Sequence, residues 1–252
     1  MLLAIDIGNT TATLGLFDSK RLCASWRIPT AECAGVRVVA RAVASRLGKR
    51  RGGRVDGVCI ASVVPRLGRV FRDACRDLFG IGPLFATPRT AGIRIRRYDR
   101  RQIGADRLVG ALAAYARCRR AVIVVDAGTA VTFDAVDSSG AYLGGAIAPG
   151  MRLAGQALRE MTAKLPFVSL KRAGRAIGRT TRESIRSGIC FGWGGLVDNL
   201  VRSIAKEMKL RPVVVATGGD ARLIANASQT IDRIVPHLIL EGLKIVWENN
   251  RK

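Results

Sequence analysis

A short loop motif occurs twice in this chain, once in each half. The first copy is Asp6-Ile7-Gly8-Asn9-Thr10-Thr11 and the second is Asp126-Ala127-Gly128-Thr129-Ala130-Val131-Thr132, each after an apolar, strand-like run. The glycine lets backbone amides approach a polyphosphate closely, and the aspartate at the strand end can face a metal ion or its waters. We therefore predict a duplicated domain that closes on a nucleotide from two sides.

The same order of elements is predicted in both halves. Three short antiparallel strands come first, and alternating helices and strands follow, so each half is an α/β unit with a mixed sheet. The three strands are predicted at 2–6, 11–17 and 22–28 in the first half and at 121–125, 131–136 and 141–148 in the second. We expect two domains, residues 1–119 and 120–252.

Helices and weaker strands complete the predicted pattern. Helices are predicted at 34–48, 65–79, 105–119 and from Pro149-Gly150 to about Ala163, and weaker strands at 83–86, 91–95 and 231–235. The long helical region 181–209 is expected to break around Gly192 to Gly195. Lys49 to Arg54 is predicted to be a polar loop, and Leu165 to Arg179 a mobile excursion.

Composition limits the class of protein. Apolar residues make up 48% of the chain, which is enough for packed cores, and the chain reaches Asp6 without a basic leader. No apolar run approaches the roughly 20 residues of a membrane span, so we expect a soluble cytoplasmic protein. The six cysteines have no C-x-x-C spacing, and the single histidine, His237, argues against metal-histidine clusters and Ser-His-Asp chemistry.

The formal charge of +23 attracts anions of several kinds, including nucleic acid, membrane surfaces and phosphorylated substrates. Most of the 42 basic residues are arginine, and they are spread over the whole chain. Local clusters are not interleaved with a stacking set of aromatic residues. We therefore interpret them as solvated faces. The clusters lie at 46–54, 94–101, 117–120 and 171–175.

A third glycine turn, Thr217-Gly218-Gly219, also follows an apolar strand. Taken alone, the first loop motif is weak, because an ordinary hairpin turn can use Gly-Asn. Three such turns are what a nucleotide needs when two loops hold the phosphates and one lets the backbone approach the adenosine. The set of three favours nucleotide binding.

The segment Gly104-Ala105-Asp106-Arg107 places a carboxylate and a guanidinium side by side at a predicted helix start. Taken alone, this pattern is explained better by an ordinary helix cap with a solvated arginine than by a functional role. In the functional interpretation, the neighbouring cation and the helix dipole keep Asp106 ionised, so that it can accept a hydroxyl proton during phosphoryl transfer. Arg107 could then bind a substrate carboxylate through its two-pronged donor set.

Two further motifs have plain structural explanations beside functional ones. Gly144 to Gly150 is a strand flanked by turns, and its glycines either punctuate those turns or allow close packing near the phosphate loops. Thr180-Thr181-Arg182-Glu183 has the pattern of a helix cap, in which Thr180 or Thr181 supplies the capping hydroxyl, and a binding role is the alternative.

Seven motifs in order resemble those of the type III pantothenate kinases over nearly the whole chain. This family belongs to the acetate and sugar kinase, Hsp70 and actin superfamily, so the resemblance implies duplicated RNase H-like domains of the actin-like ATPase type. The motifs are Asp6-x-Gly8-Asn9-Thr10, Ser62-Val63-Val64-Pro65, Gly104-Ala105-Asp106-Arg107, Asp126-Ala127-Gly128-Thr129-Ala130-x-Thr132, Gly144-Gly145-x-Ile147-x-Pro149-Gly150, Ile177-Gly178-x-x-Thr181 and Thr217-Gly218-Gly219.

The resemblance implies ATP-dependent phosphorylation of the terminal hydroxyl of pantothenate to 4'-phosphopantothenate, the first step towards coenzyme A. Asp106 resembles the general base, and Asp126 the ligand of a monovalent cation, K⁺ or NH₄⁺. Mg²⁺ would bridge the ATP phosphates, with Asp6 acting directly or through water. The implied ATP-binding residues are Asp6, Gly8, Asn9, Thr10, Thr11, Thr13, Thr129, Gly218 and Gly219, and the implied pantothenate contacts are Tyr98, Gly104, Ala105, Asp106, Arg107 and Thr181.

The resemblance also implies a homodimer in which Thr181 reaches the substrate across the interface. Thr180 stands where the family often has asparagine, and Thr13 where many members have lysine. An alternative function is that of a non-catalytic relative, a nucleic-acid-associated accessory transcription factor, which the charge would suit. A further alternative is another small-molecule kinase. The presence of Asp6, Asp106 and Asp126 favours an enzyme over a regulator, because a regulator has no chemical need for all three.

Overall fold

The computed structural model describes residues 1–19, 21–48, 54–96 and 98–251, and the chain divides into two compact units. Unit 1 consists of Met1–Ile93, Asp99–Ala113 and the C-terminal segment from Leu238. Unit 2 consists of Arg94–Tyr98 and Ala114–His237. Of the predicted polar loop, residues 49–53 lie outside the described residues.

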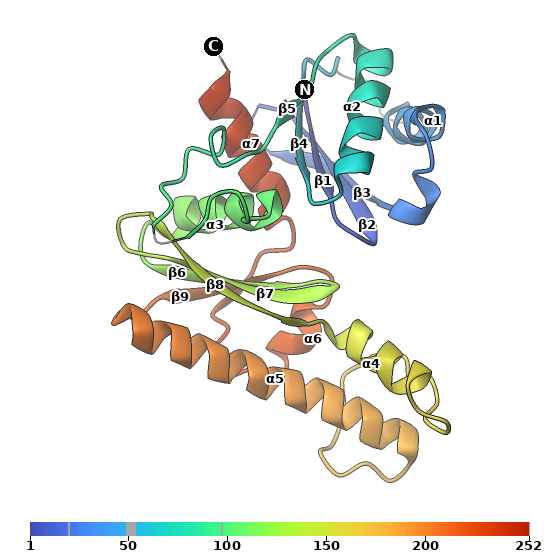
Figure 1. Ribbon diagram of the computed structural model, residues 1–252, viewed down its shortest axis with the longest axis vertical. Helices are drawn as coiled ribbons and strands as arrows, with labels where there is room; N and C mark the ends of the chain where they lie inside the picture. Colours follow the sequence, from blue (N-terminus) through green and yellow to red (C-terminus); the bar gives the residue numbers. More distant parts are fainter. Residues whose placement is uncertain (20, 49–53, 97, 252) are drawn as a thin grey trace. The chain divides into compact units, whose positions relative to one another are not determined.

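Unit 1 is built on a five-stranded mixed sheet with the strand order β3-β2-β1-β4-β5 (Figure 1). Strands β1 to β3 form an antiparallel meander, and β4 and β5 continue the sheet in parallel to β1. The strands are β1 (Leu2–Ile7), β2 (Thr11–Phe17), β3 (Leu22–Pro29), β4 (Gly57–Ser62) and β5 (Leu84–Phe85).

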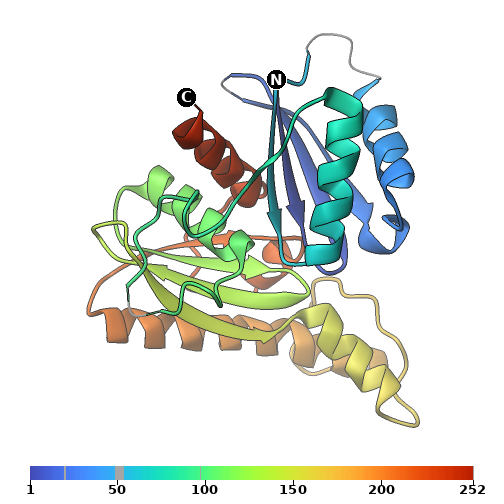
Figure 2. The ribbon, with the colours of Figure 1, turned by 45° about the horizontal axis from the view of Figure 1, so that its top comes forward.

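Helices cover both faces of the unit 1 sheet. The pair α1 and α2 lies on one face and α7 on the other, and the views in Figures 1 and 2 agree on this. Helix α2 begins with Pro65, whose fixed φ suits the first turn, and ends before Gly80, which has a φ of 67°. The bounds are η1 (Thr30–Glu32), α1 (Val36–Leu47), α2 (Pro65–Phe79), α3 (Ala105–Cys118) and α7 (Leu238–Asn250).

Helix α7 comes last in the chain but packs on β1 and β4 of unit 1. Gly57 on β4 permits this packing, because a Cβ there would lie 2.3 Å from the ring of Trp247. The predicted domains 1–119 and 120–252 stay a prediction, and the contacts of α7 group it with the sheet of the first half.

Unit 2 repeats the same sheet. Its strand order, β10-β9-β6-β7-β8, is that of unit 1 written from the other edge, with β6, β7 and β8 as the antiparallel meander and β9 and β10 parallel to β6. The elements are β6 (Val122–Ala127), β7 (Ala130–Val136), β8 (Tyr142–Pro149), α4 (Met151–Glu160), α5 (Thr181–Met208), β9 (Val213–Thr217), α6 (Ala221–Ala225) and β10 (Arg233–Ile234).

The duplication extends to individual residues. In both units the central strand is buried except at its aspartate, Asp6 or Asp126, and the second strands of the two units also share one burial pattern. The predicted fold class, two mixed sheets flanked by helices, is therefore confirmed.

Helix α5 has no break, which corrects the prediction for Gly192 to Gly195. It runs without interruption from Thr181 to Met208. A glycine inside a helix costs about 1 kcal/mol relative to alanine, but tertiary packing can outweigh this cost. At Gly194 a Cβ would lie 2.5 Å from the carbonyl oxygen of Ala227, so the close approach of the next segment requires this glycine.

Smaller differences concern the weakest signals. The predicted strand at 91–95 contributes only an isolated bridge between Ile95 and Tyr142, and the predicted strand at 231–235 is reduced to Arg233–Ile234. Both segments are short, so few ladder hydrogen bonds fix them. Between Leu165 and Thr180 there is no helix or strand.

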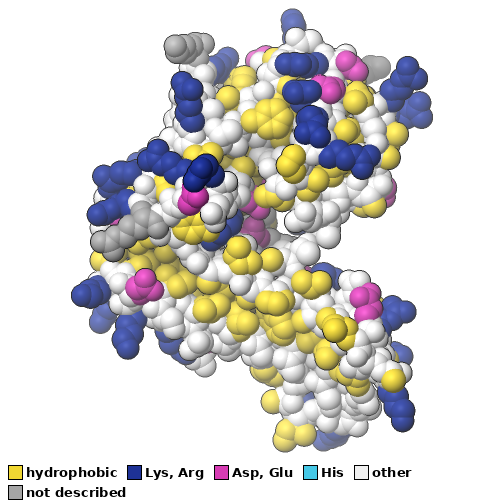
Figure 3. Space-filling view, viewed as in Figure 1, with side chains coloured by type: hydrophobic (Ala, Val, Ile, Leu, Met, Phe, Trp, Pro, Cys, Tyr) yellow, Lys and Arg dark blue, Asp and Glu magenta, His cyan; other side chains and the backbone are white. Residues whose placement is uncertain are grey.

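Most of the Lys and Arg side chains that the structure describes are at least partly exposed, and Arg107 is buried. Figure 3 shows Lys and Arg side chains at separate places on the visible face of each unit, with hydrophobic side chains between them. Within the part of the chain that the structure describes, no helix is long and apolar enough to cross a membrane.

Candidate functional site

Each predicted phosphate loop follows the central strand of its sheet. In unit 1, Asp6 on β1 lies opposite Thr13 on β2 and Ala61 on β4. Directly opposed residues project from the same face of a sheet, so Asp6 and Thr13 share a face. The loop is closed by a hydrogen bond of 3.1 Å from the Gly8 amide to the Thr11 carbonyl.

The loop of unit 2 has the same construction. Asp126 lies opposite Thr132 and Thr217, and the Gly128 amide donates to the Ala130 carbonyl at 2.9 Å. The structure therefore builds the two copies of the motif on equivalent strands, as the sequence predicts.

The third glycine turn lies against the loop of unit 2. Gly218 has a φ of 93°, and a Cβ there would lie 2.4 Å from Oδ1 of Asp126 and 2.5 Å from the Ala127 carbonyl oxygen. Only glycine combines this φ with this approach. The turn then connects to the loop through the Asp220 amide, which donates to the Ala127 carbonyl at 3.0 Å. The predicted residues Asp126 and Gly218 are thus neighbours.

The segment Gly104 to Arg107 forms the start of α3 in unit 1. A Cβ on Gly104 would lie 2.5 Å from Oδ1 of Asp106 and 3.6 Å from the Val63 side chain, which follows β4. The Val63 amide donates to the Ile7 carbonyl at 3.1 Å. Gly104, two residues before the candidate base, therefore lies beside Val63, which is bonded to the end of β1.

Burial, rather than the neighbouring cation, dominates the electrostatics of Asp106. Loss of solvent raises the pKa of this carboxyl, and the Arg107 amide, which donates to Asp106 Oδ1 at 2.8 Å, and the Arg107 charge oppose that rise only in part. The Arg107 charge lowers the pKa, which is the predicted direction, but burial outweighs it; that Asp106 is ionised at neutral pH stays a prediction. A carboxylate with a raised pKa is a stronger base than an exposed one.

Tyr98 belongs to unit 2 and lies near a buried polar pair. Its ring meets that of Tyr142 edge to face, with centroids 5.9 Å apart at an angle of 78°. The Tyr142 hydroxyl donates to buried Asp134 at 2.8 Å. Gly144, with a φ of 122°, leaves room for Tyr98, because a Cβ would lie 3.1 Å from Cδ2 of that ring.

Thr181 is the exposed first residue of α5, and Thr180 caps this helix. The Glu183 amide donates to Thr180 Oγ1 at 3.2 Å, and the Arg179 amide donates to Glu183 Oε2 at 2.8 Å. The capping interpretation of this motif is confirmed for Thr180, which leaves the hydroxyl of Thr181 available for another role.

The candidate site residues fall into two groups. Unit 1 carries Asp6, Gly8, Asn9, Thr10, Thr11, Thr13 and Gly104 to Arg107, and unit 2 carries Tyr98, Asp126, Thr129, Thr181, Gly218 and Gly219. Across the described ranges, no group of three or more His, Cys, Asp or Glu side chains is arranged to hold a metal ion.

Sequence reasoning missed one polar pair beside these residues. Arg152 forms a two-pronged ion pair with Asp220, which directly follows the glycine turn. Asp220 was visible as the residue after Thr217-Gly218-Gly219, but nothing in the sequence connects it to Arg152.

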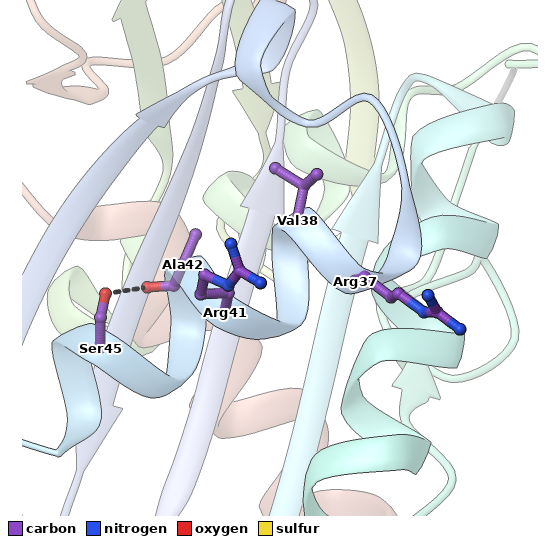
Figure 4. A pocket seen from close by; sticks show the side chains of 5 residues that line it. All are labelled: Arg37, Val38, Arg41, Ala42 and Ser45. Carbon is purple, nitrogen blue, oxygen red and sulfur yellow. Dashed lines mark hydrogen bonds between the residues drawn. The ribbon is translucent and has the colours of Figure 1, made fainter.

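Unit 1 also has a shallow hollow on its surface. It is formed along the outer face of α1 by Arg37, Val38, Arg41, Ala42 and Ser45 (Figure 4). The Ser45 hydroxyl is already bonded to the Ala42 carbonyl of its own helix, at 3.1 Å. None of the predicted site residues lines this hollow.

Solved structures define the class of fold. The chain superposes on a putative 2-dehydro-3-deoxygalactonokinase from Sinorhizobium meliloti with a TM-score of 0.59, at 12% identity and covering 98% of both chains. It superposes on MreB 5 of Spiroplasma citri with a TM-score of 0.56, at 9% identity and covering 98% of this chain and 96% of that chain. The fold is that of the actin-like ATPases and sugar kinases.

Sequence comparison narrows this class to a family. Residues 2–203 match the sequence profile described as type III pantothenate kinase. A protein named type III pantothenate kinase from Anaeromyxobacter sp. (strain K) is 42% identical over 255 residues, covering 100% of both chains. The chain belongs to the type III pantothenate kinase family, which confirms the resemblance of the seven motifs. The alternative function, that of a nucleic-acid-associated accessory transcription factor, is not favoured by these comparisons.

Proposed function

We propose that this chain transfers the γ-phosphoryl group of ATP to the terminal hydroxyl of pantothenate and so forms 4'-phosphopantothenate. The observation that carries the proposal is the pair of aspartate loops on equivalent strands of a duplicated sheet, in a member of this family. An aspartate at the strand end with a glycine after it suits a polyphosphate and its metal ion.

The two loop motifs and the glycine turn would supply the contacts with the nucleotide. The loop from Asp6 to Thr13 would bind phosphates through its amides and hydroxyls, Thr129 would supply a second phosphate contact, and Gly218-Gly219 would approach the adenosine. The donor set fits Mg²⁺, because one or two carboxylates together with phosphates and water usually hold this ion. Bound Mg²⁺ neutralises charge on the phosphates, and Asp6 would hold it directly or through water.

The monovalent cation, K⁺ or NH₄⁺, would bind at Asp126. The carboxylate and the carbonyl oxygens at the end of β6 are hard donors of the kind that such cations prefer. Gly218 packs against Asp126 but leaves the space beside its Oδ1 open for the cation, because glycine has no Cβ there.

Asp106 would act as the general base. It would accept the proton of the pantothenate hydroxyl as that oxygen bonds to the γ-phosphorus and the bond to the leaving ADP oxygen breaks. Its raised pKa supports this role. Most of the rate would come from positioning and charge neutralisation, because phosphoryl transfer needs little covalent chemistry from the protein.

Pantothenate would be recognised through its carboxylate and its amide chain. Arg107 is buried, and its guanidinium would bind the carboxylate with two parallel hydrogen bonds. Tyr98, Gly104 and Ala105 would line the pocket. Thr181 would contribute from a partner subunit of a homodimer.

The surface of unit 2 supports the homodimer. Ile147 on β8 and Phe191 on α5 are exposed to 64% and 43%. Exposed glycines at 188, 192 and 195 open α5 to close approach, since a Cβ at each would meet nothing within 4 Å. We expect Phe191→Glu to yield a monomer by light scattering with a raised KM for pantothenate; a wild-type monomer with full activity would contradict the dimer.

The cytoplasmic location stays part of the proposal.

The activity is tested by identifying the product. Purified protein is incubated with ATP, Mg²⁺ and pantothenate, with K⁺, NH₄⁺ or neither, and the products are analysed by mass spectrometry. We expect ADP and 4'-phosphopantothenate in equal amounts and a dependence on the cation that Asp126→Asn weakens. ADP release without phosphorylated pantothenate would contradict the proposed substrate.

A further inference from the structure

A buried carboxylate and an exposed arginine form a two-pronged ion pair in unit 2. Nε of Arg152 lies 3.0 Å from both carboxylate oxygens of Asp220, and Nη2 lies 2.7 Å from Oδ1. Asp220 is 4% exposed in its side chain, whereas Arg152 is 68% exposed. The pair joins the first turn of α4 to the residue that follows the glycine turn.

Both ends of this pair are attached to the second phosphate loop. On one side, the Asp220 amide donates to the Ala127 carbonyl at 3.0 Å, and the turn before it packs on Asp126. On the other side, the Gly150 amide, two residues before Arg152, donates to the Thr129 carbonyl at 3.0 Å. The ion pair therefore closes a ring of contacts around residues 127–130.

An ion pair of this kind fixes the orientation of the two segments more than it stabilises the fold. The desolvation of a buried carboxylate offsets most of its attraction to the arginine, so such pairs are weak evidence for stability. A bidentate arginine and carboxylate nevertheless fix a relative orientation. The orientation fixed here is that of Gly218-Gly219, two residues that would otherwise lose conformational entropy when a ligand orders them.

We propose that Arg152 and Asp220 are positioning residues that hold the turn 217–219 in its binding conformation and thereby set the affinity for the nucleotide. This inference rests on the proposed function, in which the turn approaches the adenosine of ATP. Neither side chain contacts the transferred phosphoryl group in this account. The pair acts on nucleotide binding and leaves the chemical step and pantothenate binding unchanged.

The test compares Arg152→Gln, Asp220→Asn and the double variant with wild type. Binding of a non-hydrolysable ATP analogue is measured by calorimetry, and KM is determined for each substrate. Arg222→Ala is the control, because it removes one exposed positive charge from α6, next to Asp220, in the same unit. Melting temperatures report folding, and Arg152→Gln changes an exposed residue, so it tests the proposal even if Asp220→Asn does not fold.

We expect each single variant to weaken analogue binding and to raise KM for ATP about tenfold. This is the effect expected when a hydrogen bond to a charged group no longer holds the turn in its binding conformation. KM for pantothenate and kcat should stay within about twofold, and the double variant should bind no worse than the weaker single one. Unchanged analogue binding in folded variants, an equal rise in both KM values or the same loss in Arg222→Ala would overturn the inference.

The calorimetric measurement of analogue binding distinguishes a failure of this inference from a failure of the proposed function. A wild-type protein that binds the analogue but does not phosphorylate pantothenate would refute the substrate, while the variants would still show whether the pair sets nucleotide affinity. A wild-type protein that binds no nucleotide would overturn both.

Discussion

The two aspartate loops connect equivalent strands, β1 to β2 in unit 1 and β6 to β7 in unit 2. They differ by one residue in length. Ile7 pairs with Ala12 across the first loop, whereas Ala127 pairs with Val131 across the second, so the loop of unit 1 has one residue more. In both units the third strand then ends in proline, and the next amide donates to the loop at 3.0 Å.

This single residue changes how each loop is held. In unit 1 the position after the proline is Thr30, whose hydroxyl donates to the Asn9 carbonyl at 2.7 Å. In unit 2 it is Gly150, where a Cβ would lie 2.3 Å from the Thr129 carbonyl oxygen and 2.4 Å from that of Gly128. The longer loop leaves room for a side chain that binds it, and the shorter one requires backbone packed on backbone.

The strands beside the loops differ as well. After β4 the chain continues through Val63, whose amide donates to the Ile7 carbonyl, and enters α2 at Pro65. After β9 it turns at Gly218 before the Asp220 amide makes the corresponding bond to Ala127. This difference is compatible with the proposed function, in which the first loop offers hydroxyls to the phosphates and the turn at Gly218 approaches the adenosine.

The largest effect is expected for Gly150→Ala. The added Cβ cannot fit beside two carbonyl oxygens, so the loop or α4 must move, at a cost of about 3 kcal/mol in the free energy of unfolding. Denaturant unfolding measures this, with Gly82→Ala as the control because a Cβ there meets nothing within 4 Å. Equal stability of the two variants would contradict the backbone packing of the shorter loop.

A smaller loss is expected for Asp198→Asn on α5 of unit 2. Burial alone would raise the pKa of Asp198, but hydrogen bonds from Ser228, Gln229 and Thr230 outweigh it and lower the pKa. The carboxylate therefore stabilises the fold above its unfolded pKa, and this contribution is lost as the pH falls through the lower folded pKa.

At neutral pH the Asp198→Asn variant should lose about 2 kcal/mol of unfolding free energy, because an amide cannot accept all of these bonds. The difference from wild type should shrink as the pH falls towards 3. Denaturant unfolding at several pH values checks this, and a difference that grows towards acid would be the wrong sign.

Thr30→Val should cost less, about 1 kcal/mol, because it removes one hydrogen bond near the surface and keeps the shape of the side chain. The same change should raise KM for ATP, since the first loop loses its side-chain restraint. Steady-state kinetics with ATP varied gives this value. An unchanged KM would show that the longer loop holds its conformation without the hydroxyl.

The smallest change in stability is expected for Asp106→Asn. This change has the opposite sign to the change expected for Asp198→Asn. Because burial raises the folded pKa of Asp106, its contribution is present below the unfolded pKa and lost as the pH rises through the folded pKa. The variant should therefore be at least as stable as wild type at neutral pH. A lower melting temperature at pH 7 would contradict burial as the dominant influence.

Much of the fold could be predicted because its signals are local. The apolar runs that end at Asp6 and Asp126, followed by glycine turns, predict both meanders, and Pro65 predicts the start of α2. The family also followed from motifs in order. These features depend on neighbours in sequence, so no tertiary contact had to be known.

The rest depends on contacts between distant segments. The continuity of α5 reflects the approach of Ala227 to Gly194, and the raised pKa of Asp106 reflects burial that its own sequence neighbours do not reveal. The pairing of Arg152 with Asp220 joins residues far apart in the chain. The roles assigned to the site residues stay predictions.

The most direct test of the central claim is the rate of 4'-phosphopantothenate formation by Asp106→Asn beside wild type, at saturating ATP and pantothenate with Mg²⁺ and K⁺. If Asp106 accepts the hydroxyl proton, the variant should keep its fold and its nucleotide binding while kcat falls by about 10²–10⁴. A folded variant that turns over at nearly the wild-type rate would contradict the account.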